Sequence, residues 1–142
     1  MRPMKILLAV DGSEYSRRML DYMTSHSKSF GDSTFTAAYT VPQVSLRAIA
    51  LVGVDAARDY YAEEANAVLD PIRQLLTDHG VQADCIYRVG QPAAEIATLA
   101  ESENFDLVVM GSHGHNALKS LVLGSVATQV LAACKVPVLI VR

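Results

Sequence analysis

The stretch Asp106-Leu107-Val108-Val109-Met110-Gly111-Ser112-His113-Gly114 joins an apolar run to two closely spaced glycines, and Gly124-Ser125 follows after nine further residues. A short run that is apolar at almost every position is typical of a strand buried on both faces, as in a parallel sheet. Glycines directly after such a strand favour a tight loop. The stretch therefore predicts a strand, a loop and then a helix.

Outside this stretch, strand-like and helix-like segments alternate along the chain. Strands are predicted at 6–10, 35–41, 81–89, 106–110 and 137–141, and helices at 13–29, 57–79, 92–104 and within 122–133. Alternation of this kind predicts the α/β class: a three-layer α/β/α arrangement around an open five-stranded parallel sheet. With 142 residues, we expect residues 1–142 to form a single domain.

Two segments are harder to interpret from the sequence. Residues 43–56 fit either a mobile loop or a helical turn over a ligand. Pro71 lies inside the helical period of 57–79, and it predicts a kink or an interruption near Asp70 because proline lacks an N–H.

Composition excludes several classes of protein. The formal charge of −3 and the mixing of acids with bases argue against a nucleic-acid partner, which would favour a basic stripe. No apolar run reaches the ~20 residues of a membrane span, and no signal-peptide cleavage region follows the first strand. Cys85 and Cys134 lack metal-ligand spacing and are expected to be reduced thiols. We therefore expect a cytoplasmic protein with no membrane partner.

The glycine loop has the features of a phosphate site. Gly111 would let the chain leave the strand in a conformation that a side chain hinders, and Gly114 would let the backbone approach a ligand. Gly124 and Ser125 would place free N–H groups at a helix start, where anions are favoured, and the Ser125 hydroxyl could bind phosphate or cap the helix. The alternative is a turn with a helix cap and no ligand. The pattern is neither a Walker A loop nor the dinucleotide fingerprint.

Further segments extend a resemblance over the whole chain. The G-x-x-G-x9-G-S pattern, Val10-Asp11-Gly12-Ser13, the run from Leu121 to Ala127 and the ending Val136–Val141 resemble the ATP-binding subgroup of the universal stress protein family. The resemblance implies a Rossmann-like sheet with strand order 3-2-1-4-5. Ligands of such sheets bind at the carboxyl ends of the strands where that order reverses.

The resemblance also implies a role for individual residues in binding ATP, ADP or AMP. Adenosine would lie against Ala9, Val10, Asp11, the backbone of Val41, and Met110; the first phosphates against Gly111, His113 and Gly114; the outer phosphates against Gly124, Ser125 and Val126. Mg²⁺ or Mn²⁺ would bridge the phosphates. Asp11 could instead cap the following helix, and zinc at His113 and His115 is disfavoured because further ligands are missing nearby.

The resemblance implies a nucleotide-binding regulatory protein of the stress response, with a regulatory protein partner that the sequence leaves unidentified. The alternatives are a slow ATP hydrolase, for which His113, His115 and Lys119 form a thin catalytic set, and a nucleotide-free dimeric interaction module. In the implied order the last strand is an apolar edge, so we expect a homodimer through Val136–Val141. A monomer with a covered edge is the alternative.

Overall fold

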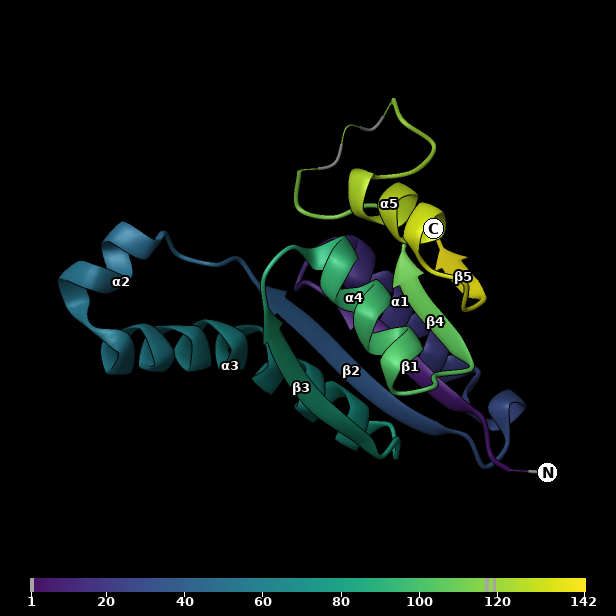
Figure 1. Ribbon diagram of the computed structural model, residues 1–142. Coiled ribbons are helices and arrows are strands. Elements are labelled where there is room, and N and C mark those ends of the chain that lie inside the picture. Colours follow the sequence, from purple (N-terminus) through teal and green to yellow (C-terminus); the bar gives the residue numbers. More distant parts are fainter. Residues whose placement is uncertain (1, 117, 119) are drawn as a thin grey trace.

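The computed structural model describes residues 2–116, 118 and 120–142. Five parallel strands form one sheet in the order β3-β2-β1-β4-β5, with helices on both sides (Figure 1). The predicted fold class and the strand order are therefore confirmed. The strands are β1 Lys5–Val10, β2 Thr34–Val41, β3 Ala83–Val89, β4 Leu107–Gly111 and β5 Val138–Val141. The helices are α1 Glu14–Ser25, the 3₁₀ helix η1 Ser27–Phe30, α2 Leu46–Val52, α3 Val54–Asp78, α4 Pro92–Ser102 and α5 Ser125–Ala133.

The central strand β1 divides the hydrophobic core into two layers. Its residues alternate between the faces of the sheet, and all five from Ile6 to Val10 are buried. Ile6, Leu8 and Val10 pack with α1 and α3, whereas Leu7 and Ala9 pack with α4 and α5. Burial on both faces explains why β1 reads as a continuous apolar run. Cys85 and Cys134 are half-buried on opposite faces, so they cannot pair with each other.

The predicted helix 13–29 is divided in two. The Ser13 hydroxyl accepts a hydrogen bond from the Ser16 N–H, so Ser13 is the N-cap and α1 begins at Glu14. The helix ends at Ser25, and η1 follows with its own turn up to Gly31. The third strand begins at Ala83 rather than at residue 81, because the Val81 N–H bonds to the Leu76 carbonyl and belongs to the turn that closes α3.

Of the two outcomes predicted at Pro71, a kink or an interruption, the interruption is wrong. α3 is assigned as a continuous helix from Val54 to Asp78, with Pro71 in its interior. Proline removes the hydrogen bond to the Ala67 carbonyl, but burial of apolar side chains on both sides of it holds the two halves on one core. These buried residues are Ala57, Ala65, Leu69, Ile72 and Leu76.

The ambiguous segment 43–56 contains a helix. Ser45 caps α2 by accepting the Ala48 N–H, and Gly53, with a φ of 94°, makes the turn into α3. In Figure 1, α2 and the first turns of α3 stand clear of the sheet. Among the helices of the described residues, none is long and apolar enough to cross a bilayer.

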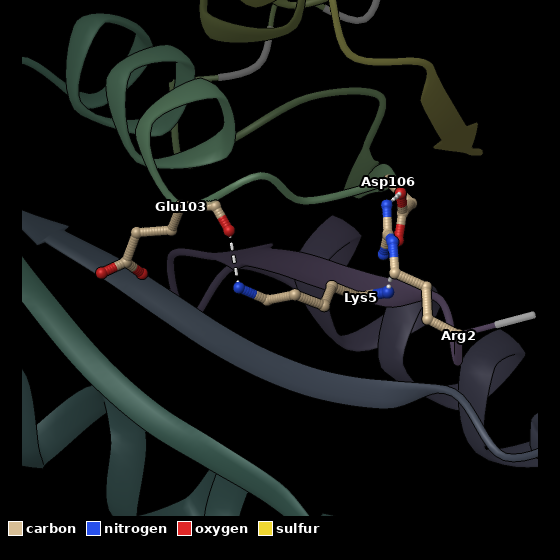
Figure 2. Close-up of polar contacts among 4 residues, drawn as sticks. All are labelled: Arg2, Lys5, Glu103 and Asp106. Carbon is tan, nitrogen blue, oxygen red and sulfur yellow. Dashed lines mark hydrogen bonds and ion pairs between the residues drawn. The ribbon is translucent and has the colours of Figure 1, made fainter.

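The amino end of the sheet is held by a group of polar contacts (Figure 2). The Arg2 guanidinium donates to both carboxylate oxygens of Asp106, at 2.7 and 2.6 Å. The Lys5 N–H donates to the same carboxylate at 2.8 Å, and the Lys5 ammonium donates to the Glu103 carbonyl at 2.6 Å. These contacts join the start of β1 to the start of β4, far along each strand from their carboxyl ends.

The same contacts favour the charged form of Asp106. Hydrogen bonds from the Arg2 side chain and, next, from the Lys5 backbone lower the pKa of Asp106 from 3.8 to about 2. A lowered folded-state pKa means that the carboxylate adds stability above pH 3.8. That contribution disappears as the pH falls through about 2.

We therefore predict that Asp106→Asn lowers the melting temperature at pH 7, and that its difference from the wild type shrinks between pH 4 and pH 2. Thermal unfolding followed by circular dichroism measures both. Asp59→Asn, at an exposed site on α3, is the matched control and should change little at either pH. A difference for Asp106→Asn that stays constant over this range would contradict the assignment.

Candidate functional site

The two central strands end side by side and send their chains in different directions. β1 pairs with β2 on one side and with β4 on the other, so the strand order reverses between β1 and β4. The loop after β1 leads into α1, and the loop after β4 leads into α5. Such a switch point leaves a crevice at the carboxyl edge of an open α/β sheet.

A cleft lies at this edge of the sheet, where ligands of open α/β folds bind. Nine of the predicted site residues line it: Ala9, Val10, Asp11, Met110, Gly111, His113, Gly114, Gly124 and Val126. Five lining residues were missed by sequence reasoning: Tyr39, Thr40, Pro92, Ile96 and Ala127. The walls are mostly apolar.

A second hollow continues from the first toward the start of α5. It shares Asp11, Gly114, Gly124 and Val126 with the cleft, and it places the predicted site residue Ser125 on its wall. His115, Asn116, Leu118 and Leu121 complete the lining. The two hollows therefore meet at the four residues that they share, and the second lies beside the N-terminus of α5.

Val41 is the predicted residue that lines neither hollow. Its side chain is buried in the layer under α1 and α3, and its carbonyl accepts the Gly90 N–H at 3.0 Å. Thr40 lies in the cleft instead. Strand alternation could have found it, because Ala38, two residues earlier, packs on the α4 face.

Close backbone packing explains the glycines of the loop. A Cβ on Gly111 would lie 2.9 Å from the backbone of Tyr15, and a Cβ on Gly124 would lie 3.0 Å from the Cα of His113. Neither glycine has a positive φ, so the predicted hindrance to a side chain at Gly111 comes from packing against Tyr15 and not from an unusual backbone conformation. A Cβ on Gly114 would instead meet a carboxylate oxygen of Asp11 at 2.9 Å, inside the cleft.

Asp11 has a structural role and also faces the cleft. Its Oδ1 accepts the Ser13 N–H at 2.9 Å, which shapes the turn before α1, while the cap itself is made by Ser13. Its other carboxylate oxygen, Oδ2, lies beside Gly114. Its carbonyl accepts from Nε2 of His115 at 2.6 Å. Asp11 therefore links the loop after β1 to the loop after β4.

The start of α5 presents backbone donors at two of the three predicted positions, Ser125 and Val126, but not at Gly124. The Gly124 N–H is not free, because it donates to the Ser112 carbonyl at 2.7 Å. Gly124 is also the N-cap, so Ser125 is the first helical residue and its hydroxyl is not the cap. The first intrahelical bond runs from the Thr128 N–H, so the three preceding N–H groups, of Ser125, Val126 and Ala127, have no acceptor within the helix.

The imidazole of His113 is occupied by protein contacts. Its Nδ1 lies 2.9 Å from the Ser112 hydroxyl, and its Nε2 lies 2.8 Å from the Leu121 carbonyl. Nε2 of His115 is likewise directed to a carbonyl. Over the described residues, no group of three or more His, Cys, Asp or Glu side chains could hold a metal ion. Lys119, considered above as a catalytic group, lies outside the described residues.

One titratable group on the cleft wall is perturbed. Burial raises the pKa of Tyr39 above its usual value, and the nearby charges of Glu64 and Asp11 add to the effect. The phenol therefore stays protonated at neutral pH and remains able to donate a hydrogen bond.

A model of the universal stress protein family matches residues 3–142. The chain belongs to this family. It is 32% identical to universal stress protein YxiE of Bacillus subtilis, over 97% of this chain and 98% of that protein. The resemblance drawn from the loop motif and the strand endings is therefore confirmed for the family.

Solved structures agree with this assignment. MJ0577 of Methanocaldococcus jannaschii has a TM-score of 0.82 and 28% identity to this universal stress protein, covering 99% of this chain and 96% of that one. A universal stress protein solved in complex with cAMP has a TM-score of 0.70 and 25% identity, covering 98% and 97%.

The packing of the glycines predicts different losses of stability for Gly111→Ala and Gly114→Ala in this universal stress protein. Gly111→Ala should lower the free energy of unfolding by about 1–3 kcal/mol, because the backbone of Tyr15 must move to admit the Cβ. Gly114→Ala should cost much less, since the end of the Asp11 side chain can turn away.

Urea denaturation of both variants measures these free energies. Equal losses of stability for Gly111→Ala and Gly114→Ala would contradict the packing argument.

Proposed function

We propose that this universal stress protein binds an adenine nucleotide, with ATP as the leading candidate and ADP or AMP as alternatives, and acts as a regulatory protein in a stress response. One observation carries the proposal: an apolar cleft at the switch point runs into a hollow where the N–H groups at the start of α5 have no helical acceptor. Such a combination suits a flat apolar base joined to an anionic tail.

The apolar part would take adenosine. Pro92, Ile96 and Met110 offer apolar contacts for a base, and Ala9 and Val10 form the floor between the loops. Asp11 Oδ2, on the cleft side of its carboxylate, would accept a hydrogen bond from a ribose hydroxyl. The phenol of Tyr39 and the hydroxyl of Thr40 supply further polar groups on the opposite wall.

The polar part would take the phosphates. The N–H groups of Ser125, Val126 and Ala127 lie at the positive end of the α5 dipole, which favours a negative charge. The missing side chain of Gly114 leaves a place for Oδ2 of Asp11, which lies 2.9 Å from where a Cβ would be. Mg²⁺ or Mn²⁺ would then be held through the phosphates and water, in keeping with the absence of a three-residue ligand cluster among the described side chains.

The solved complex with cAMP supports an adenine ligand, because that protein shares the family and 25% of its sequence with this chain. Binding is favoured over turnover by the arrangement of the histidines. Efficient hydrolysis needs a group that positions the attacking water, whereas Nε2 of His113 and of His115 are both directed to backbone carbonyls. A slow hydrolase remains the alternative.

We also propose a homodimer through the last strand, of which Val138–Val141 is regular β structure. β5 is an edge of the sheet, and its four residues are half-buried. Because the Pro137 and Val141 carbonyls accept bonds from the β4 side, the backbone groups of Val138 and Ile140 face outward. An unpaired apolar edge of this kind is suited to strand addition by a second copy.

Nucleotide binding is tested by thermal shift and calorimetry with ATP, ADP, AMP and GTP, each with Mg²⁺, on protein freed of co-purified ligand. Adenine nucleotides at 100 times their dissociation constant should add about 2.7 kcal/mol of stability. Gly114→Ala should abolish most of this gain while keeping the wild-type stability without nucleotide.

Failure of all four nucleotides to bind would overturn the proposal and leave the glycine loop a purely structural element. Turnover of ATP at enzyme-like rates would instead favour the hydrolase.

Dimerisation is tested by sedimentation of two variants of Ile140. Ile140→Pro removes the outward N–H of this residue together with its side chain. Ile140→Ala also removes most of the side chain but keeps the N–H. The wild type and Ile140→Ala should sediment as dimers and Ile140→Pro as a monomer. A wild-type chain that is monomeric at micromolar concentration would refute the interface.

A further inference from the structure

We propose that His113 is a positioning residue. Its hydrogen bond to the Leu121 carbonyl, here called the clasp, joins the two limbs of the loop between β4 and α5, residues 112–116 and residues 120–124. The clasp sets the affinity for the phosphates, and His113 itself does not contact them. The inference rests on the proposed nucleotide site and assigns to one side chain the ordering of its polar end. It departs from the expectation that His113 itself cradles a phosphate.

The clasp spans eight residues of the loop. Nε2 of His113 lies 2.8 Å from the Leu121 carbonyl, and because a carbonyl only accepts, Nε2 carries the hydrogen. In the neutral ring Nδ1 is then an acceptor, and the Ser112 hydroxyl, 2.9 Å away, donates to it. Both nitrogens are therefore engaged, and a phosphate contact by this ring would require breaking one of the two bonds.

The ring is also held from the side of α1. Its centroid lies 4.9 Å from that of the Tyr15 ring, whose other contacts include the Arg18 guanidinium at 5.0 Å. Arg18 is in turn paired with Glu14 at 2.6 Å. The backbone of Tyr15 is the surface against which Gly111 packs. Helix α1, which also packs against the loop at Gly111, therefore holds the His113 ring in position.

The bond to Leu121 orders the limb that reaches the phosphates. At its base, the loop is closed by the Gly124 N–H bond to the Ser112 carbonyl. Leu121, three residues farther out, is held by His113, and both Leu121 and Leu118 line the hollow beside Ser125. Without the clasp, this limb would lose the side-chain hydrogen bond at Leu121 and, among the described hydrogen bonds, would keep the one from the Thr128 hydroxyl to the Gly124 carbonyl at its base. Binding a phosphate would then have to restore the order of the limb.

This arrangement predicts that loss of the clasp weakens the binding of ATP but not the binding of adenosine. Adenosine would contact the cleft walls from β1, β2 and α4 and Met110 of β4, none of which the clasp holds, whereas ATP also needs the ordered hollow. His113→Ala should weaken ATP binding about tenfold, the equivalent of losing one net hydrogen bond of about 1.4 kcal/mol. Adenosine binding should remain within about twofold.

His113→Gln provides the matched control. The terminal amide of glutamine can reach the position of the histidine Nε2 and donate to the Leu121 carbonyl, but it carries no positive charge at any pH. A clasp is therefore rescued by glutamine, with ATP affinity within about threefold of the wild type. If His113 instead bound phosphate as a cation, glutamine would not restore the ATP affinity.

The experiment is calorimetric titration of the wild type, His113→Ala and His113→Gln with Mg-ATP and with adenosine. Amide hydrogen exchange of residues 120–124 is measured on the same nucleotide-free proteins. We expect faster exchange in His113→Ala, near wild-type exchange in His113→Gln, and the Nε2–H tautomer of His113 in the wild-type nitrogen spectrum. Equal losses of ATP and adenosine affinity, or a glutamine variant as weak as alanine, would overturn the positioning role.

The exchange data separate this inference from the proposed function. A wild-type chain that binds neither ATP nor adenosine overturns the nucleotide site and, with it, the effect on phosphate affinity. Unchanged loop exchange in His113→Ala overturns the clasp itself, whatever the nucleotide results.

Discussion

The pairing of β1 with β4 is the constraint on which the rest of the structure depends. Both strands are buried on both faces, and their register, with Ala9 opposite Met110, makes them end together. Because the chain leaves β1 for α1 and leaves β4 for α5, two loops must diverge from adjacent strand ends. The cleft is a consequence of this divergence.

The second loop is held by backbone contacts more than by side chains. Gly111 packs on the backbone of Tyr15, Gly124 packs on His113, and the Gly124 N–H closes the loop on the Ser112 carbonyl. This packing places the first turn of α5 beside Asp11 and Gly114. The glycine pattern therefore serves the fold first. The phosphate site that we propose uses the backbone donors that this packing leaves exposed at the helix start.

Local patterns in the chain predicted the α/β class, whereas the strand order and most residues of the cleft came from the resemblance to the universal stress protein family. The buried run 106–110 and the glycine spacing predicted the strand, the loop and the helix after it. The residues that sequence reasoning missed depend on tertiary contacts. Pro92 and Ile96 come to the cleft only when α4 covers the sheet, and Thr40 enters through the phase of β2.

The errors have a similar origin. Pro71 does not interrupt α3, because packing on a common core outweighs one lost hydrogen bond. The Gly124 N–H is not available to a ligand, because an acceptor twelve residues earlier in the chain, the Ser112 carbonyl, takes it. The motif likewise could not predict that the His113 ring is hydrogen-bonded within the protein, since its partner Leu121 lies across the loop.

The central claim is that backbone donors at the start of α5 hold the phosphates of an adenine nucleotide. A titration of ¹⁵N-labelled protein with Mg-ATP and, separately, with adenosine tests it most directly. We predict that ATP shifts the amide signals of Gly114, Ser125, Val126 and Ala127 far more than adenosine does, while both ligands shift Ala9 and Val10. Saturation with ATP that leaves the signals of Ser125, Val126 and Ala127 in place would contradict the claim.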